Sequence, residues 1–347
     1  MRTIIFLLLV SLGACVSGNQ EDAPSSRETD EDTREDEGVL ATNFDTPWSI
    51  AATDDGFYIT ERNGKLFYVE RDGEITEQMI ELSASLYTRG EAGLLGFSLL
   101  DADQAFIYYS YETEEGPRNR VSQIVKTNDK WTESDVLIDD IPGARIHNGG
   151  RIEQGPDGHI FITTGDAASP SSAQDKDSLA GKILRMNVDG SIPEDNPFQD
   201  SYVYSYGHRN PQGLAWTEDN TMYSTEHGES AKDEVNVIAP GRNYGWPVIE
   251  GDQQEEGMEP PLYHTGSDTW APSGLAAHDG SLYIAALRGE RLIKFDPSSL
   301  RTEVLSEEYG RIRDLLFTDE SGYGITSNRD GRGNPDEEDD VFFRFNP

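Results

Sequence analysis

Basic residues and carboxylates recur at the ends of short predicted strands in this chain. His147, Asp166 and Arg209 would supply a base, a carboxylate that orients it and a cation. A neutral histidine held by a carboxylate can take a proton from a hydroxyl group, and an arginine can stabilise the negative charge that develops. Any one of these residues alone could be a structural ion pair, but the set predicts a catalytic site.

Three further arginines, Arg288, Arg311 and Arg313, occupy equivalent places near strand ends. Guanidinium groups bind carboxylates through paired hydrogen bonds, so three of them together suit a ligand that carries several carboxylates. The alternative is that they form buried ion pairs with Asp314 or Asp330. In total, three histidines and five arginines are expected to lie together at one mouth of a central channel that the strands would surround. They are His147, His208, His227, Arg209, Arg288, Arg311, Arg313 and Arg329.

The elements that would position these residues form a repeat of two short strands joined by a Gly/Asp-rich turn. The turns lie near Asp55, Asp103, Asp157, Glu218, Asp279 and Asp319, and a third apolar run follows most copies. The copies occupy residues 46–60, 93–111, 149–166, 213–227, 273–287 and 313–328. Such repeats predict an all-β fold, a six-bladed β-propeller of four-stranded antiparallel blades over residues 39–347. Residues 39–41 are expected to pair beside residues 341–345 and to close the ring.

The chain is strongly acidic, with 65 acidic residues, 28 basic residues and a net charge of −37. Such a surface repels nucleic acids and anionic membranes, so neither is expected as a partner. Surplus carboxylates on a folded domain are typical of proteins from high-salt organisms, and an ordinary acidic secreted protein is the alternative.

The N-terminus has the features of an export signal. Arg2 precedes the apolar stretch 4–10, which is too short to span a bilayer, and residues 12–15 read Leu-Gly-Ala-Cys. This resembles the lipobox of prokaryotic lipoproteins and predicts a signal peptide over residues 1–15 with lipidation of Cys15, the single cysteine. Residues 16–38 are acidic and poor in apolar residues, so we expect a disordered tether. The predicted location is the cell envelope, on the periplasmic or extracellular side, with a lipid anchor to the membrane. A plain signal peptide with an incidental cysteine is the alternative.

Several longer motifs resemble the soluble quinoprotein glucose/sorbosone dehydrogenase family, and its aldose sugar dehydrogenase branch in particular. The likeness extends from about Asn43 to Phe345. The motifs are HNGGR (147–151), TGD (164–166), LAGKILR (179–185), DGSIPEDNP (189–197), GHRNPQG (207–213) and NYGWP (243–247).

The resemblance implies a propeller that binds pyrroloquinoline quinone (PQQ) and Ca²⁺ and oxidises aldoses to lactones at the anomeric carbon. His147 would be the general base, Asp166 its orienting carboxylate, and Arg209 the cation beside the quinone that accepts hydride. The remaining roles implied by the resemblance are cofactor contacts at Glu91, Asn210, Arg288, Arg311 and Arg313, calcium ligation by the backbone carbonyls of Gly228 and Glu229, and a second calcium site at Glu234, Tyr244 and Asp252.

The sequence also allows two other functions and leaves the role of Trp270 open. A calcium-dependent lactonase-type hydrolase could use His147, Asp166 and Glu226, but it has no need of three arginines. A non-catalytic binding propeller would have no use for a general base. Trp270 could stack on a sugar ring or belong to the core. The sequence has no haem-attachment motif, so an external electron acceptor, a cytochrome or a quinone pool, is expected to reoxidise the cofactor.

Overall fold

A computed structural model describes residues 37–318 and 321–347, in which the regular secondary structure is β-strands except for one short 3-10 helix, η1 (Pro170–Ala173). The predicted signal peptide, Cys15 and most of the predicted tether lie outside the described residues. No helix among the described residues has the length and apolar character needed to cross a membrane.

Four of the sheets contain four antiparallel strands each. The first comprises β10 (Ile152–Gln154), β11 (Ile160–Thr164), β12 (Lys182–Met186) and β13 (Val203–Tyr206). The second comprises β14 (Pro211–Trp216), β15 (Met222–Glu226), β16 (Glu234–Ile238) and β17 (Tyr263–His264). The third comprises β18 (Pro272–His278), β19 (Ser281–Ala286), β20 (Arg291–Asp296) and β21 (Arg301–Ser306). The fourth comprises β22 (Ile312–Thr318), β23 (Ser321–Thr326), β24 (Phe342–Phe345) and β1 (Gly38–Ala41).

The fifth sheet has eight strands and differs from the predicted four-stranded unit. Its two antiparallel halves are joined by parallel pairing of β5 with β9 at Met79–Lys130, Ile80–Trp131 and Glu81–Thr132. The first half is β2 (Pro47–Ala52), β3 (Gly56–Glu61), β4 (Leu66–Glu70) and β5 (Ile75–Glu81). The second half is β6 (Leu94–Leu99), β7 (Gln104–Thr113), β8 (Gly116–Thr127) and β9 (Lys130–Pro142). The prediction of an all-β chain with four-stranded antiparallel sheets is therefore confirmed, but the expected division into six separate sheets is not.

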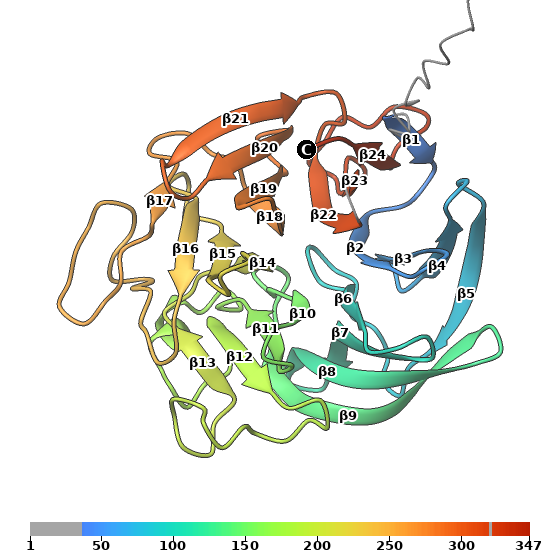
Figure 1. The fold of residues 1–347 in the computed structure, drawn as a ribbon. Coiled ribbons are helices and arrows are strands. Elements are labelled where there is room, and N and C mark those ends of the chain that lie inside the picture. Colours follow the sequence, from blue (N-terminus) through green and yellow to red (C-terminus); the bar gives the residue numbers. More distant parts are fainter. Residues whose placement is uncertain (1–36, 319–320) are drawn as a thin grey trace, which may run out of the picture. The chain divides into compact units, whose positions relative to one another are not determined.

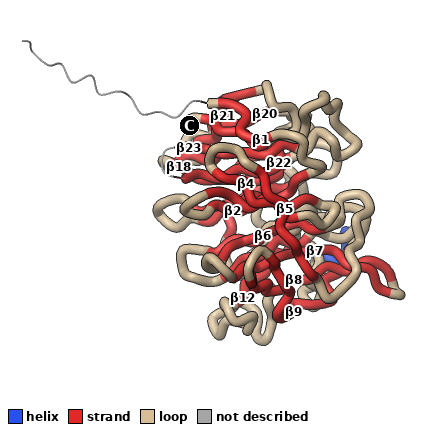
Figure 2. Tube along the Cα trace, turned by 90° about the vertical axis from the view of Figure 1, so that its right-hand side faces the viewer, coloured by secondary structure: helices blue, strands red, loops and turns tan. Residues whose placement is uncertain are grey.

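The sheets are arranged around a common centre (Figure 1). Neighbouring inner strands contact one another in the order β2, β6 and β10, and again in the order β14, β18, β22 and back to β2. Apolar clusters fill the spaces between adjacent sheets, as where Trp48 and Tyr108 pack with Ile162 and Leu184. Burial of these apolar faces between layers is the main driving force for the arrangement. Figure 2, turned by 90°, shows that strands predominate and that loops connect them at the edges.

The ends of the described chain meet in one sheet, as predicted. β1 pairs antiparallel with β24, with Gly38 opposite Arg344 and Val39 opposite Phe343. The first described strand thereby completes a sheet whose other three strands come from the last part of the chain.

An ion pair joins the inner strands at the centre. The Arg151 Nη1 atom lies 2.6 Å from Asp314 Oδ2, and both side chains are almost fully buried. Arg151 also donates from Nε to the Gln212 carbonyl oxygen at 3.0 Å, while Asp314 Oδ2 accepts from the Ile50 backbone N–H at 3.0 Å. This Arg151–Asp314 pair thus connects residues of β14, β2 and β22 through polar contacts that are shielded from water.

Candidate active site

A cavity of about 420 Å³ opens where loops from several sheets meet. Its lining includes four predicted site residues that are basic, namely His147, Arg209, Arg288 and Arg311. The complete lining is His147, Arg209, His227, Gly228, Glu229, Ser230, Asp233, Thr269, Ala271, Leu287, Arg288, Arg311 and Arg332. The volume is in the usual range for a small-molecule site.

His147 is held at the cavity by Asp166. The His147 Nδ1 atom lies 2.8 Å from Asp166 Oδ1, and Asp166 is fully buried while the His147 side chain is 14% exposed. The backbone at Gly165, next to Asp166, approaches the His147 backbone so closely that a side chain at Gly165 would collide with the His147 carbonyl oxygen. With Asp166 accepting from Nδ1–H, the Nε2 atom keeps its lone pair, so His147 can act as a base.

Trp246 is a neighbour of this pair that the sequence did not single out for a role. Its indole Nε1 donates to Asp166 Oδ2 at 2.9 Å, so both carboxylate oxygens of Asp166 are hydrogen-bonded. The guanidinium of Arg209 lies over the Trp246 ring, with 5.2 Å between its central carbon and the ring centroid. Trp246 therefore fixes the carboxylate and the cation of the predicted catalytic set together.

Removing this indole donor gives a testable result. Trp246→Phe is expected to lower kcat about tenfold, because a hydrogen bond to a charged group contributes about 1.5–3 kcal/mol and orients Asp166 against His147. The measurement is steady-state kinetics together with the cofactor dissociation constant, which we expect to stay within about threefold of wild type. Trp216→Phe is the matched control, since Trp216 lies outside this cavity. An unchanged kcat in Trp246→Phe would show that the indole does not position Asp166.

The predicted cofactor contacts are only partly found in the cavity lining. Arg288 and Arg311 line the cavity, but Arg313 does not, because its Nη1 donates to Gln212 Oε1 at 3.0 Å and to Ser273 Oγ at 3.3 Å. Burial, together with the neighbouring arginines, lowers the pKa of Arg313 to about 9. Arg311 is paired with Asp330, with Nη2 and Oδ2 2.6 Å apart. The ion pair that the sequence left open as an alternative is therefore present at Arg311.

Two residues expected at the mouth lie elsewhere. His208 is fully buried, stacks on Tyr244 with ring centroids 4.8 Å apart, and has its Nε2 2.8 Å from Ser205 Oγ. Arg329 donates to the backbone carbonyls of the 336–339 segment. Both expectations were wrong because local packing decides where each side chain goes: His208 enters the core while its neighbour Arg209 reaches the cavity, and Arg329 binds the carbonyls of the 336–339 segment.

His227 does line the cavity, close to the predicted catalytic set. Burial is the main cause that lowers the pKa of His227 to about 4, and the positive charges of Arg209 and Arg313 act in the same direction. His227 is therefore neutral at neutral pH. Its Nε2 atom has no hydrogen-bond partner among the described residues.

Several other buried donors near the cavity have no partner within the described part of the chain. They are Asn210 Nδ2 and the Nε atoms of Arg209, Arg311 and Arg313. Asn210 itself is fixed, because its Oδ1 accepts from the Gly149 N–H at 3.0 Å. Of these residues, Arg209 and Arg311 line the cavity. Buried donors without acceptors are costly, so these two side chains suit a ligand rich in carboxylate and carbonyl oxygens.

The loop predicted to bind calcium through its backbone forms another wall. Gly228 and Glu229 line the cavity, and Asp233 Oδ1 accepts from the Gly228 N–H at 3.0 Å. The other carboxylate oxygen of Asp233 accepts from the backbone N–H groups of Trp270 and Ala271, at 2.6 and 2.8 Å. Asp233 was not predicted from the sequence to have a role. Its two carboxylate oxygens connect the loop at Gly228 with the loop at Trp270 and Ala271 through hydrogen bonds.

The three residues predicted to form a second calcium site do not converge. Glu234 accepts from the Gly251 N–H at 3.2 Å, and the Tyr244 hydroxyl donates to the Val237 carbonyl oxygen at 2.6 Å. Asp252 is exposed and pairs with His264 at 3.0 Å. Within residues 37–318 and 321–347, no group of three or more His, Cys, Asp or Glu side chains is placed to hold a metal ion.

Trp270 belongs to the core and not to the cavity lining. It is 7% exposed and stacks on Tyr263 with ring centroids 5.6 Å apart and an interplanar angle of 21°. Of the two readings left open for Trp270, the core aromatic is the one that the structure supports.

Comparison with known proteins agrees with this geometry. The family model described as Glucose / Sorbosone dehydrogenase matches residues 44–333. The solved PQQ-bound aldose sugar dehydrogenase of Streptomyces coelicolor is 34% identical, with a TM-score of 0.83 over 88% of this chain and 96% of its own. Aldose sugar dehydrogenase YliI of Escherichia coli is 29% identical over 82% of this chain and 87% of its own.

A third relative, quinoprotein glucose dehydrogenase B of Acinetobacter calcoaceticus, is 30% identical over 64% of this chain and 54% of its own. The family resemblance inferred from the motifs is confirmed by these matches. The chain belongs to the glucose/sorbosone dehydrogenase family and is an enzyme of the glucose-type dehydrogenase class.

Proposed function

We propose that this protein oxidises aldose sugars at the anomeric carbon to lactones, with PQQ and Ca²⁺ as cofactors. The observation that carries the proposal is the His147–Asp166 pair, at 2.8 Å, beside a cavity lined by Arg209 and Arg311, whose Nε donors have no acceptor among the described residues. When bound, PQQ supplies a two-electron acceptor and Ca²⁺ a Lewis acid. Arg288 and Arg311 would hold carboxylates, Asn210 a further acceptor oxygen, and the carbonyls of Gly228 and Glu229 the calcium ion.

The protein's own residues would perform the proton chemistry. His147 would accept the proton of the anomeric hydroxyl at Nε2, and Asp166 would stabilise the imidazolium that forms. Arg209, held against the Trp246 ring, would balance negative charge that develops nearby. His227, neutral because burial lowers its pKa to about 4, would offer Nε2 as a hydrogen-bond donor or acceptor without adding charge.

We also propose that the fold is a six-bladed propeller in which the eight-stranded sheet counts as two blades joined at β5 and β9. The contacts between successive inner strands support this count. From the sequence alone, we further propose that the protein is exported and anchored to the membrane through Cys15. It would pass electrons to a cytochrome or a quinone pool.

The test is dye-linked sugar oxidation by the purified protein freed of cofactors, with PQQ and Ca²⁺ added together and each omitted in turn. We expect aldose-dependent dye reduction only when both are present. A His147→Gln variant assayed in parallel controls for direct reduction of the dye. Lactone hydrolysis without PQQ, and no dye reduction, would instead support the lactonase-type hydrolase. Absence of both activities in a folded protein would support a non-catalytic binding propeller.

A further inference from the structure

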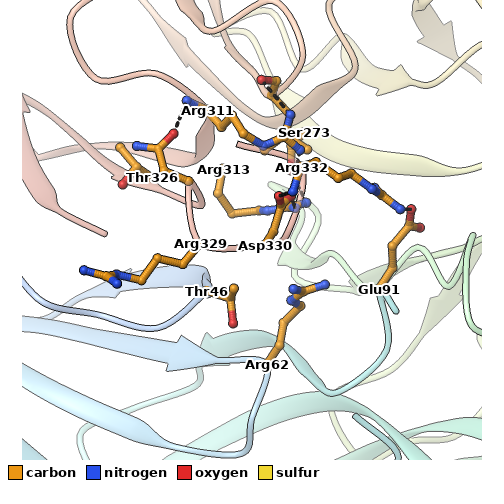
Figure 3. Close-up of polar contacts among 12 residues, drawn as sticks. Thr46, Arg62, Glu91, Ser273, Arg311, Arg313, Thr326, Arg329, Asp330 and Arg332 are labelled. Carbon is orange, nitrogen blue, oxygen red and sulfur yellow. Dashed lines mark hydrogen bonds and ion pairs between the residues drawn. The ribbon is translucent and has the colours of Figure 1, made fainter. Parts of the chain in front are cut away.

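Arg332 lines the cavity although no motif predicted it to do so. It extends from the loop after β23, where its backbone N–H donates to Asp330 Oδ1 at 2.9 Å. Its Nη2 atom lies 2.8 Å from Glu91 Oε1, so an ion pair bridges two parts of the chain 241 residues apart. Figure 3 shows Arg332 reaching from the Asp330 loop to Glu91, with Arg311 and Arg313 nearby.

Glu91 is bound to the catalytic histidine as well as to Arg332. Its Oε2 atom accepts from the His147 backbone N–H at 2.9 Å. Burial opposes ionisation of this carboxyl group, but the hydrogen bond from His147 and the charge of Arg332 prevail and lower the pKa of Glu91 to about 2. Glu91 therefore carries a full negative charge at neutral pH, next to a cavity that is proposed to bind an anionic cofactor.

The other charged groups in this region leave Arg332 as the main counter-charge of Glu91. Asp330 is already paired with Arg311 at 2.6 Å, and Arg313 lies 4.0 Å from the same oxygen. Arg62 donates to the Gly90 carbonyl oxygen at 2.6 Å and not to Glu91. The Arg332 side chain is 52% exposed while that of Glu91 is only 15% exposed, so the ion pair joins a largely buried carboxylate to a cation that solvent can reach.

We propose that Arg332 neutralises Glu91 and thereby allows the cavity to bind a ligand with several carboxylates close to His147. Like charges at close range disfavour binding, and a single unpaired carboxylate in a part-buried site weakens the affinity for an anion. In this proposal Glu91 positions the His147 backbone through its hydrogen bond to the His147 N–H. Arg332 offsets the repulsion that the Glu91 charge would otherwise exert on an anionic ligand. The inference rests on the proposed function, since it takes PQQ as the anionic ligand.

The test is a double-mutant cycle with Arg332→Gln, Glu91→Gln and the double variant. The dissociation constant of PQQ is measured by fluorescence titration in the presence of Ca²⁺, without sugar or turnover. We expect Arg332→Gln to weaken binding tenfold or more, because it leaves Glu91 unpaired. Glu91→Gln keeps an oxygen acceptor for the His147 N–H, so the double variant is expected to return to within about threefold of wild type.

Arg301→Gln is the matched control, since Arg301 is exposed on β21 and its replacement changes the net charge equally. If Arg332→Gln binds PQQ as tightly as wild type, or if the double variant is as weak as Arg332→Gln alone, neutralisation of Glu91 is overturned while the proposed function stands. If the wild-type protein does not bind PQQ at all, the cofactor assignment fails and this inference fails with it. Thermal denaturation of each variant identifies any that do not fold, and Arg332→Met then replaces Arg332→Gln, with the same weakening expected because it also removes the cation beside Glu91. Arg332→Lys keeps the charge and is expected to bind PQQ within about threefold of wild type.

Discussion

Replacing His147 with Gln is expected to lower kcat for aldose oxidation by about 10²- to 10⁴-fold, the usual contribution of a general base. Glutamine has no group that takes a proton near neutral pH, while its size lets it occupy the same place beside Asp166. Affinity for PQQ should change little, because the arginines that line the cavity, Arg209, Arg288 and Arg311, remain. Steady-state kinetics and a PQQ titration measure the two effects separately.

His159→Gln is the control for this substitution. His159 pairs with Asp157 at 3.0 Å and lies outside the cavity lining, so we expect its replacement to leave kcat unchanged. A His147→Gln enzyme with wild-type kcat would exclude His147 as the base, and the proton would have to be taken by another group of the cavity.

Breaking the Arg151–Asp314 pair should have the largest effect on stability. Arg151→Met is expected to lower the free energy of unfolding by about 3–5 kcal/mol, because it leaves the carboxylate of Asp314 buried without its cation. The Gln212 carbonyl oxygen also loses the 3.0 Å hydrogen bond from Arg151 Nε, and the guanidinium stacked 4.6 Å from the Trp48 ring is lost. Urea denaturation followed by two independent probes measures the change.

An exposed ion pair provides the comparison. Lys130 and Glu81 are 2.6 Å apart, but their side chains are 39% and 61% exposed, so Lys130→Met is expected to cost less than about 1 kcal/mol. The double variant Arg151→Met/Asp314→Leu should be more stable than Arg151→Met, since no buried charge is left unpaired. Equal losses in Arg151→Met and Lys130→Met would show that the central pair contributes no more than a surface pair.

The repeated hairpins could be predicted because their signals are local. Each copy has an apolar strand, a turn containing Gly or Asp and a second apolar strand, and these features act over fewer than about 20 residues. All six predicted hairpins are present as β2–β3, β6–β7, β10–β11, β14–β15, β18–β19 and β22–β23. The parallel pairing of β5 with β9 could not be predicted, since it depends on how two finished hairpins meet and no local pattern specifies that contact.

The same distinction applies to the candidate site. His147, Asp166 and Arg209 could be selected because they stand in motifs at strand ends. Trp246 and Arg332 could not be assigned their contacts, since the sequence separations from Asp166 and Glu91 are 80 and 241 residues. Whether a guanidinium faces the cavity or an internal carboxylate is decided by packing, which is why Arg332 lines the cavity and Arg313 does not.

The pairing of β1 with β24 affects the order in which the molecule can be completed during synthesis. A ribosome makes Gly38–Ala41 about 300 residues before Phe342–Phe345, so β1 has no partner until β24 has been translated. Closing a loop of this length is slow compared with forming local hairpins. The local hairpins can therefore form first, while the sheet of β22, β23, β24 and β1 stays incomplete until β1 and β24 meet.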